Sequence, residues 1–168
     1  MIARKDQKGV GLIEVLVALL ILSVAVLGFV ALQVRAVDAT SEGINKVQAM
    51  NLARDIAEKI RTNRSAVNTY VASFGSSAAD RVSFAENCYT EFCSPAEKAD
   101  FDVAQSSLAA QLLGMTMNMM TCDGIANGRS CIYVAWGETS ATNGDGTNDC
   151  TTNGTYRSNS SCIVMEPY

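Results

Sequence analysis

Residues 4–32 read RKDQKGVGLIEVLVALLILSVAVLGFVAL, and they are the most informative part of the chain. A short basic segment ends at Gly9, and the 23 residues from Val10 to Leu32 are almost wholly apolar. Such a run is long enough to cross a bilayer as a helix. It contains one acid, Glu14, although a carboxylate at mid-bilayer costs on the order of 2.5–3.5 kcal/mol on insertion scales. The charge therefore indicates either a position near the interface or a function that involves a partner.

A signal anchor with a stray acid is the simpler interpretation. Glu14 lies only about 6 Å along a helix from the start of the run, where water can still reach it. An ordinary secretory signal peptide does not fit, because its apolar region is shorter and a small-residue cleavage site follows it. Here the chain runs on as Gln33-Val34-Arg35-Ala36-Val37. The basic residues precede the run, so we expect them to stay cytoplasmic and the remaining chain to face outward.

The segment Lys8 to Leu19, KGVGLIEVLVAL, resembles the class III signal of type IV prepilins and pseudopilins. That family has a short basic leader ending in Gly, a Glu at the fifth mature position and a long apolar run. The resemblance implies cleavage by a prepilin peptidase between Gly9 and Val10, followed by methylation of the new amino terminus. Glu14 would then be mature residue five and would act in assembly. Val10 departs from the family, which usually has Phe or Met at this position.

Charge argues against nucleic acid as a partner. The formal charge of the 168 residues is −4, and the proposed leader has three cations and one anion, a net +2. Removing the leader from the total leaves −6 for the mature chain, which shows no basic patch. Binding to phosphates requires clustered Lys and Arg, so we expect no nucleic-acid binding.

The cysteines indicate disulfides in an oxidising compartment, because an even number lies on one side of the apolar run. The six are Cys88, Cys93, Cys122, Cys131, Cys150 and Cys162. Metal binding is the alternative, but the chain has no Cys-x-x-Cys and no His, and His is a common zinc ligand. Fifteen pairings are open. Pairing of sequence neighbours, 88–93, 122–131 and 150–162, is the simplest.

The helical pattern continues beyond the apolar run, from Val34 to about Arg61, without a proline. Its apolar residues recur mostly three, four or seven positions apart, as in an amphipathic helix. These residues are Val37, Ile44, Val47, Leu52, Ile56 and Ile60. We therefore predict one N-terminal helix of about 50 residues, with its first half in lipid and its second half packed on a globular domain.

The remaining chain predicts one more helix and three strands. Ser94 as the cap, Pro95 at the first helical position and Glu97 form a capping box at the start of the helix. We expect Phe101, Leu108 and Leu112 on its buried side and Gly114 at its end. Alternating or β-branched residues predict strands at 115–119, 131–136 and 161–166. The polar stretch Thr62 to Phe92 gives only weak signals.

The segment Gly137 to Ser160 is rich in Gly, Asn, Thr and Ser, with several turn pairs. We interpret it as a solvated turn region held by Cys150. Oxygen-bearing side chains gather there and weakly resemble a calcium loop, but the full spacing and the closing Glu are missing. They are Asn143, Asp145, Thr147, Asn148 and Asp149. We therefore predict no metal site, and no cofactor.

No catalytic constellation stands out in the sequence. The absence of His excludes nucleophiles activated by His. Nothing near Cys88 and Cys93 indicates a lowered thiol pKa. We predict that the protein is not an enzyme.

The whole pattern resembles the type IV pilin fold, an α+β fold. It implies a long N-terminal helix, half transmembrane and half amphipathic, packed on a small antiparallel sheet with a disulfide-stapled C-terminal region. The implied organisation is a leader (1–9), a transmembrane half-helix (10–32) and a periplasmic domain (33–168). Many major pilins carry Pro where this chain has Ala31. This departure favours a minor pilin or pseudopilin over the bulk subunit of a filament. The capped helix and the cysteine-bearing strands resemble minor pilins of the PilV type.

That resemblance implies a structural subunit that takes part in initiating and assembling the type IV pilus. Its partners would be other minor pilins and the major pilin, through the N-terminal helix, together with the prepilin peptidase. It would reside in the bacterial inner membrane as a single-pass protein and later in the pilus, including its tip. A minor pseudopilin of a type II secretion system shares the same leader. A signal-anchored periplasmic enzyme or metal-binding module is a further alternative.

Overall fold

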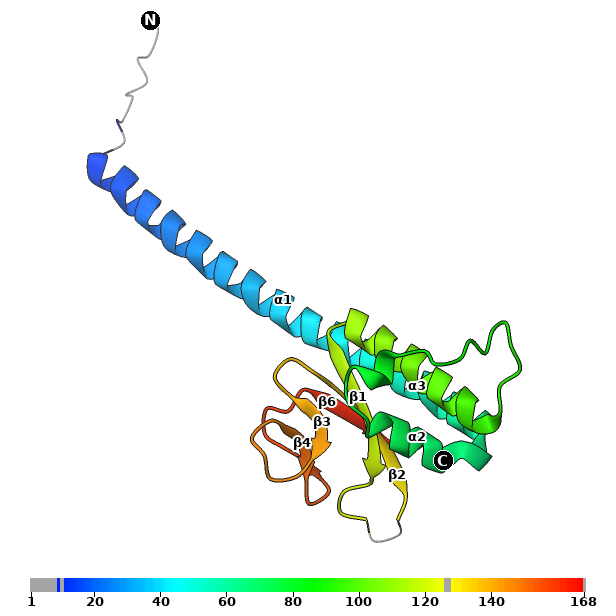
Figure 1. Ribbon diagram of the computed structural model, residues 1–168. Coiled ribbons are helices and arrows are strands. Elements are labelled where there is room, and N and C mark those ends of the chain that lie inside the picture. The colour runs from blue at the N-terminus through cyan, green and yellow to red at the C-terminus, as the bar shows by residue number, and fades with distance from the viewer. Residues whose placement is uncertain (1–8, 10, 126–127, 168) are drawn as a thin grey trace, which may run out of the picture. The chain divides into compact units, whose positions relative to one another are not determined.

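A computed structural model describes residues 9, 11–125 and 128–167 (Figure 1). The chain divides into two compact units, Met1–Gly43 and Ile44–Tyr168, which are described separately. Helix α1 spans Leu12–Thr62, so its residues up to Gly43 belong to the first unit and the others to the second.

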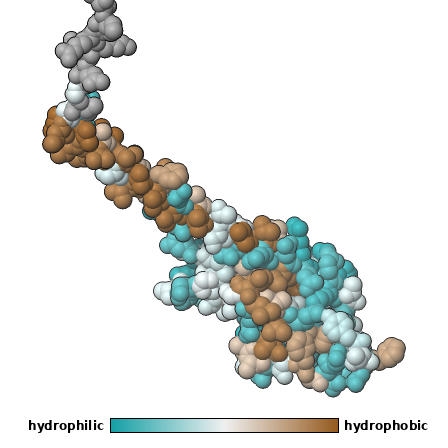
Figure 2. Space-filling model, turned by 90° about the horizontal axis from the view of Figure 1, so that it is seen from above, coloured by the Kyte–Doolittle hydropathy of each residue, from teal (hydrophilic) through white to brown (hydrophobic). Residues whose placement is uncertain are grey.

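The first unit is the apolar part of α1. Its side chains are exposed on every side of the helix, and one window has a mean hydropathy of 3.1. Figure 2 shows this hydrophobic surface in brown. By length and composition, α1 is able to cross a membrane. The Ser23 hydroxyl donates to the Leu20 carbonyl at 2.7 Å, so this polar group is satisfied within the helix, as a lipid environment requires.

The second unit combines helices with two small sheets. After α1 come 3₁₀-helix η1 (Arg64–Ala66), α2 (Val67–Phe74), 3₁₀-helix η2 (Asp80–Val82), α3 (Pro95–Leu112), β1 (Met115–Thr121), β2 (Ser130–Trp136), β3 (Ser140–Asn143), β4 (Asp149–Thr152), β5 (Thr155–Tyr156) and β6 (Cys162–Met165). The first sheet has the order β1-β2-β6 and is antiparallel. The second has the order β3-β4-β5, with β3 and β4 parallel. The α+β, type IV pilin-like architecture and the three predicted strands are confirmed.

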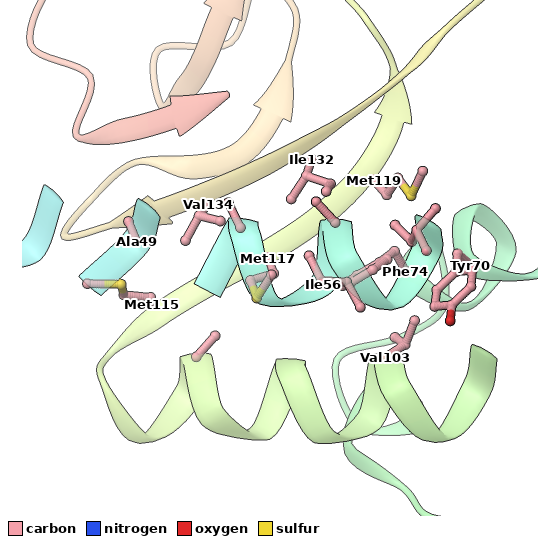
Figure 3. Close-up of a cluster of buried hydrophobic side chains, with 14 of the residues drawn as sticks. Ala49, Ile56, Tyr70, Phe74, Val103, Met115, Met117, Met119, Ile132 and Val134 are labelled. Atoms are coloured by element: carbon pink, nitrogen blue, oxygen red, sulfur yellow. The ribbon is translucent and has the colours of Figure 1, made fainter. Parts of the chain in front are cut away.

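Both faces of the central strand β2 are buried, and one of them forms the main core. Alternate residues of a strand point to opposite faces, so Ile132, Val134 and Trp136 lie together on the core side. Met115, Met117 and Met119 of β1 and side chains from α1, α2 and α3 complete this cluster (Figure 3). The alternation Met115, Met117, Met119 is therefore core packing.

The opposite face of β2 is covered by the segment that we predicted to be a solvated turn region. Cys131, Tyr133 and Ala135 pack there in a second buried cluster with Ala141 and Cys150. The prediction was wrong in part, because this segment forms β3, β4 and β5, although Cys150 does hold it through a disulfide and most of its residues are exposed or half-buried. An apolar sheet face must be covered by another layer. Although the segment is rich in Gly and Asn, its Ala141 and Cys150 provide apolar side chains that pack on this face.

The buried face of α1 in the second unit differs in part from the predicted stripe. Ile56 and Ile60 are buried as expected, but Ile44 and Val47 are more than half exposed. Val37, in the first unit, is also exposed. Alanines replace these residues on the face that packs, namely Ala49, Ala53 and Ala57. Small side chains let a helix approach its neighbours closely. The pattern of large apolar residues therefore did not predict which face of α1 is buried.

The predicted capping box of α3 is confirmed. The Glu97 amide donates to the Ser94 hydroxyl, and the Ser94 amide donates to the Glu97 carboxylate. The predicted buried side is right for Phe101 but wrong for Leu108 and Leu112, which are 38% and 81% exposed. The helix packs instead through small residues and one valine: Ala99, Val103, Ala104, Ser106, Ser107 and Ala110.

Helix α2 lies in the polar stretch for which the sequence gave weak signals. Its apolar residues Tyr70 and Phe74, four positions apart, are both fully buried in the main core. These two aromatic rings supply most of the apolar surface with which so short a helix packs on the domain.

Polar side chains cover backbone groups along the free edge of β1. Arg81 Nη1 donates to the Met117 carbonyl at 2.6 Å, and Asn118 Oδ1 accepts the Met119 amide at 2.9 Å. Asn143 Nδ2 donates to the Thr121 carbonyl at 3.4 Å. The edge is thus partly satisfied by its own side chains.

Candidate assembly site

Glu14 lies in the first turn of α1, and its side chain is exposed. Its amide donates to the Gly11 carbonyl at 3.0 Å, which fixes it within the first helical turn. An acid at this position is favourable for the helix dipole. Among the residues that the structure describes, no ion pair involves Glu14. The exposed carboxylate can therefore form an ion pair with a positive group of another molecule.

The two predicted processing residues, Gly9 and Val10, precede Glu14 in the sequence. Gly9 is exposed and lies outside the helix, with nothing within 4 Å of the position of a Cβ. Val10 and residues 1–8 lie outside the described residues. The predicted cleavage position thus remains a prediction.

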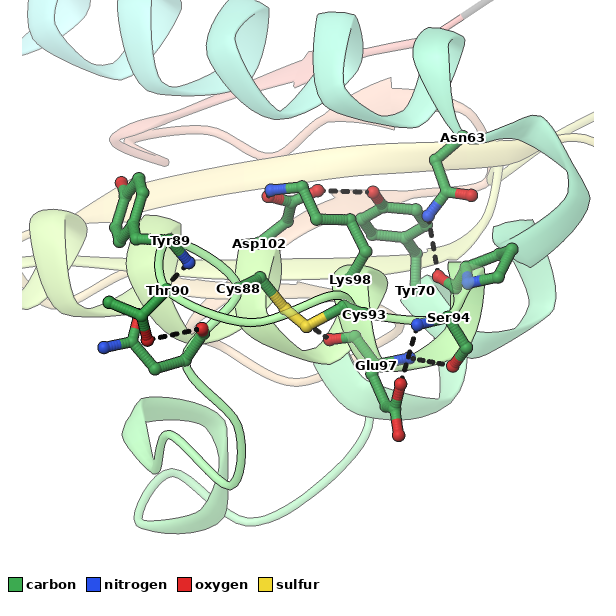
Figure 4. Close-up of a disulfide and its surroundings, with 12 residues drawn as sticks. Asn63, Tyr70, Cys88, Tyr89, Thr90, Cys93, Ser94, Glu97, Lys98 and Asp102 are labelled. Carbon is green, nitrogen blue, oxygen red and sulfur yellow. Dashed lines mark hydrogen bonds and ion pairs between the residues drawn. A yellow bond between two sulfur atoms is a disulfide. The ribbon is translucent and has the colours of Figure 1, made fainter.

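Three disulfides join the six cysteines, and each joins sequence neighbours: Cys88–Cys93, Cys122–Cys131 and Cys150–Cys162. The second closes the β1–β2 hairpin, and the third ties β4 to β6. The four sulfurs of these two bridges belong to the buried cluster on the far face of β2. The first bridge closes a short loop just before α3, as Figure 4 shows.

A buried polar group joins α2 to α3 (Figure 4). The Tyr70 hydroxyl donates to Asp102 Oδ2 at 2.7 Å, and Lys98 Nζ lies 2.6 Å from Asp102 Oδ1. Burial, followed by the hydrogen bond to Asp102, raises the pKa of Tyr70 above its ordinary value. Both carboxylate oxygens have a partner, so this group is explained as structural support.

The aspartates of the cluster that weakly resembled a calcium loop accept hydrogen bonds from neighbouring residues of the same segment. Asp149 Oδ2 accepts the Gly146 amide at 2.7 Å, and its Oδ1 accepts the Thr142 hydroxyl at 2.5 Å. Asp145 Oδ1 accepts the Thr152 hydroxyl at 2.9 Å. These bonds are turn and strand contacts. Within 9, 11–125 and 128–167, no group of three or more His, Cys, Asp or Glu is arranged to hold a metal.

The chain thus combines a long apolar N-terminal helix with a small disulfide-bonded α+β domain, which defines a type IV pilin-like protein. A family model for the prokaryotic N-terminal methylation motif matches residues 4–30. A model described as type IV pilin Tt1218 matches residues 31–104, which is less than half of the chain. Together, the two matches support the type IV pilin superfamily and a pilin or pseudopilin role. That family is structural and not enzymatic.

No curated protein and no solved structure matches the chain. The two family matches adjoin at residues 30 and 31, and together they cover residues 4–104, which contain α1, α2 and the first part of α3. The methylation motif and the apolar helix are consistent with a membrane-anchored pilin.

One feature that the sequence reasoning missed is a group of aromatic side chains before α3. Phe84 and Tyr89 each contact Phe101, a residue of α3, edge to face. The available sequence signal was the presence of three closely spaced aromatic residues, Phe84, Tyr89 and Phe92, among mostly polar neighbours.

Proposed function

We propose that the chain is a minor pilin of the PilV type, a structural subunit for initiating and assembling the type IV pilus. The observation that carries this proposal is Glu14, an exposed acid in the first turn of an apolar helix. The methylation-motif match over residues 4–30 supports it. The role needs no catalysis, no cofactor and no nucleic acid.

In this proposal, a prepilin peptidase removes residues 1–9 and methylates the amine of Val10. Residues 10–32 then hold the protein in the bacterial inner membrane, and residues 33–168 lie in the periplasm. The part of α1 in the first unit has exposed apolar side chains all around it. These side chains can pack against lipid and, later, against other helices in a bundle.

During assembly, the helix leaves lipid and joins other pilin helices, where Glu14 meets a positive amino terminus. Removing one partner of a buried charge pair is costly, on the order of 3–5 kcal/mol, whereas the intact pair adds little net stability. Glu14 therefore sets the register of the subunit more than it strengthens the contact.

A minor role is favoured over that of the bulk subunit by the course of α1. Many major pilins carry Pro where this chain has Ala31, and Pro bends a helix. Here the helix continues through Gly28 and Ala31 without interruption. In this role, the protein would contact other minor pilins and the major pilin, and one place for it in the pilus is the tip.

Exchanging Glu14 for Ala tests the proposal. The Glu14→Ala variant should insert into the inner membrane normally but be missing from sheared pili, as measured by immunoblots of both fractions. Asp38→Ala is the matched control, because Asp38 is an exposed acid on the same helix outside the motif. Normal incorporation of the Glu14 variant would refute the role assigned here.

The mass of the mature protein tests the processing step separately. Loss of residues 1–9 and a methyl group on Val10 are expected. A retained residue 1 would contradict the proposal and favour a signal-anchored enzyme or metal-binding module. Purification of the mature protein from membranes with its partners then separates a pilus subunit from a minor pseudopilin of a type II secretion system.

A further inference from the structure

The segment between η2 and α3 forms an open pocket of about 360 Å³ with aromatic walls. Phe84 and Tyr89 are exposed at its sides, while Phe101 of α3 is 6% exposed and lies deeper. Ala85, Glu86 and Asn87 complete the lining. Pockets lined by aromatic rings with a few polar groups are the usual form of a small binding site.

The rings of this pocket are held in place by contacts within the domain. The ring centroids of Phe84 and Phe101 lie 5.5 Å apart, and those of Tyr89 and Phe101 lie 5.1 Å apart, both edge to face. Gln105 donates a hydrogen bond to the Tyr89 hydroxyl. The Tyr89 amide donates to Asn87 Oδ1 at 3.1 Å, and the Cys88–Cys93 bridge begins beside it. A ligand would therefore meet a largely preformed site.

The charges at the pocket favour a cation as the ligand. Aromatic faces carry negative charge density and attract ammonium and guanidinium groups. Lys98 Nζ already lies 5.2 Å from the centroid of Phe101, but its charge is matched by Asp102. Glu86 lines the pocket and forms no ion pair within the described part of the chain. One uncompensated carboxylate next to aromatic rings is complementary to a single positive side chain.

We propose that this pocket binds a Lys or Arg side chain presented by a neighbouring protein. The contact would fix the globular domain of this chain against a partner with an exposed basic residue. The pocket belongs to the second unit and Glu14 to the first, so the two proposals rest on different residues and failure of either leaves the other testable.

Ring signals of the full-length protein report on this site directly. The chain, with ¹³C-labelled Phe and Tyr, is kept in polyoxyethylene detergent micelles, which carry neither a cation nor a sugar. The probes are the N-acetyl N-methylamides of lysine, arginine and norleucine, and methyl glucoside. Lysine or arginine should give saturable shifts at Phe84, Tyr89 and Phe101. They should bind about two- to fivefold more tightly than norleucine, the range that an exposed cation–π contact gives.

Variants separate the pocket from general attraction to an acidic protein. Glu86→Gln and Tyr89→Leu should each weaken lysine binding by about two- to fivefold. Glu138→Gln is the matched control, because Glu138 is an exposed acid after β2 and does not line the pocket. Equal binding of norleucine, preference for the glucoside, equal loss in the Glu138 variant, or no saturable shift would each overturn the proposal.

Discussion

The Tyr70 hydroxyl donates a 2.7 Å hydrogen bond to Asp102, and this fully buried contact joins α2 to α3. Because α2 has only eight residues, it cannot persist alone. Its position depends on the two aromatic rings that it buries and on this bond.

Removing this hydroxyl should destabilise the domain. We expect Tyr70→Phe to lower the free energy of unfolding by about 1.5–3 kcal/mol, the range for hydrogen bonds to charged groups. The measurement is denaturant unfolding of the full chain in micelles, followed by the fluorescence of Trp136, its single tryptophan. Tyr89→Phe is the matched control, because it removes a hydroxyl that is hydrogen-bonded to the neutral Gln105 on a side chain that is 74% exposed. Equal losses in the two variants would contradict the assigned role.

The same tyrosine gives a stability change at alkaline pH. Burial raises the pKa of Tyr70 in the folded state, so the unfolded chain loses its proton first, at about pH 10. Stability from this group is complete below pH 10 and decreases above it. The free energy of unfolding, measured from about pH 9 to about pH 11, should decrease less for Tyr70→Phe than for the unchanged protein.

The packing face of α1 can be mapped by a pair of truncations. Ile56→Ala should cost about 2–5 kcal/mol, because Ile56 is fully buried and its loss leaves a cavity. Val47→Ala should change the free energy of unfolding by less than about 0.5 kcal/mol, because Val47 is 62% exposed. The same fluorescence assay compares them. A large effect at Val47 in the isolated protein would show that the assigned face is wrong.

The disulfides should differ in how much they contribute to the stability of the folded domain. Replacing Cys150 and Cys162 together by Ala should cost about 2–5 kcal/mol, because both sulfurs are buried where β4 meets β6. Replacing Cys88 and Cys93 should cost less, because their bridge closes a shorter loop outside both buried clusters. Thermal unfolding of both double variants without reductant measures the difference. The reverse order would contradict the placement of the second core.

The capping box should contribute in a pH-dependent way. The hydrogen bond from the Ser94 amide, followed by that of its hydroxyl, lowers the pKa of Glu97 below its ordinary value. Stability from this carboxylate is present above about pH 4.5 and is lost as the pH falls. Helical circular dichroism should therefore show that Glu97→Gln destabilises at neutral pH and has little further effect in acid. Ser94→Ala should cost about 1 kcal/mol at neutral pH.

Local chemistry in the sequence predicted much of the fold. The apolar run and the absence of proline predicted α1 to about Arg61, and it ends at Thr62. Ser94, Pro95 and Glu97 specify a helix start through groups within one turn of each other, so no distant contact was needed. The strands at β1, β2 and β6 were visible because alternation within each is a local property.

Features that depend on distant contacts were not visible. Leu108 and Leu112 were expected inside, but the loop and helices around α3 bury alanines and serines of the same helix. The segment from Gly137 to Ser160 looked solvated because its burial comes from Tyr133 on another strand. Glu14 is different again: its proposed partner is the amino terminus of another subunit, so the fold of one chain does not provide it.

The covered edge of β1 limits how copies of this protein can join. Met117, Met119 and Thr121 each have one backbone group occupied by a side chain, from Arg81, Asn118 and Asn143 respectively. An open strand edge would invite another chain to extend the sheet, which is the usual route to amyloid-like aggregates. If the protein waits in a membrane before assembly, as proposed above, this edge is partly protected from irreversible self-association, and ordered growth would depend on its helix.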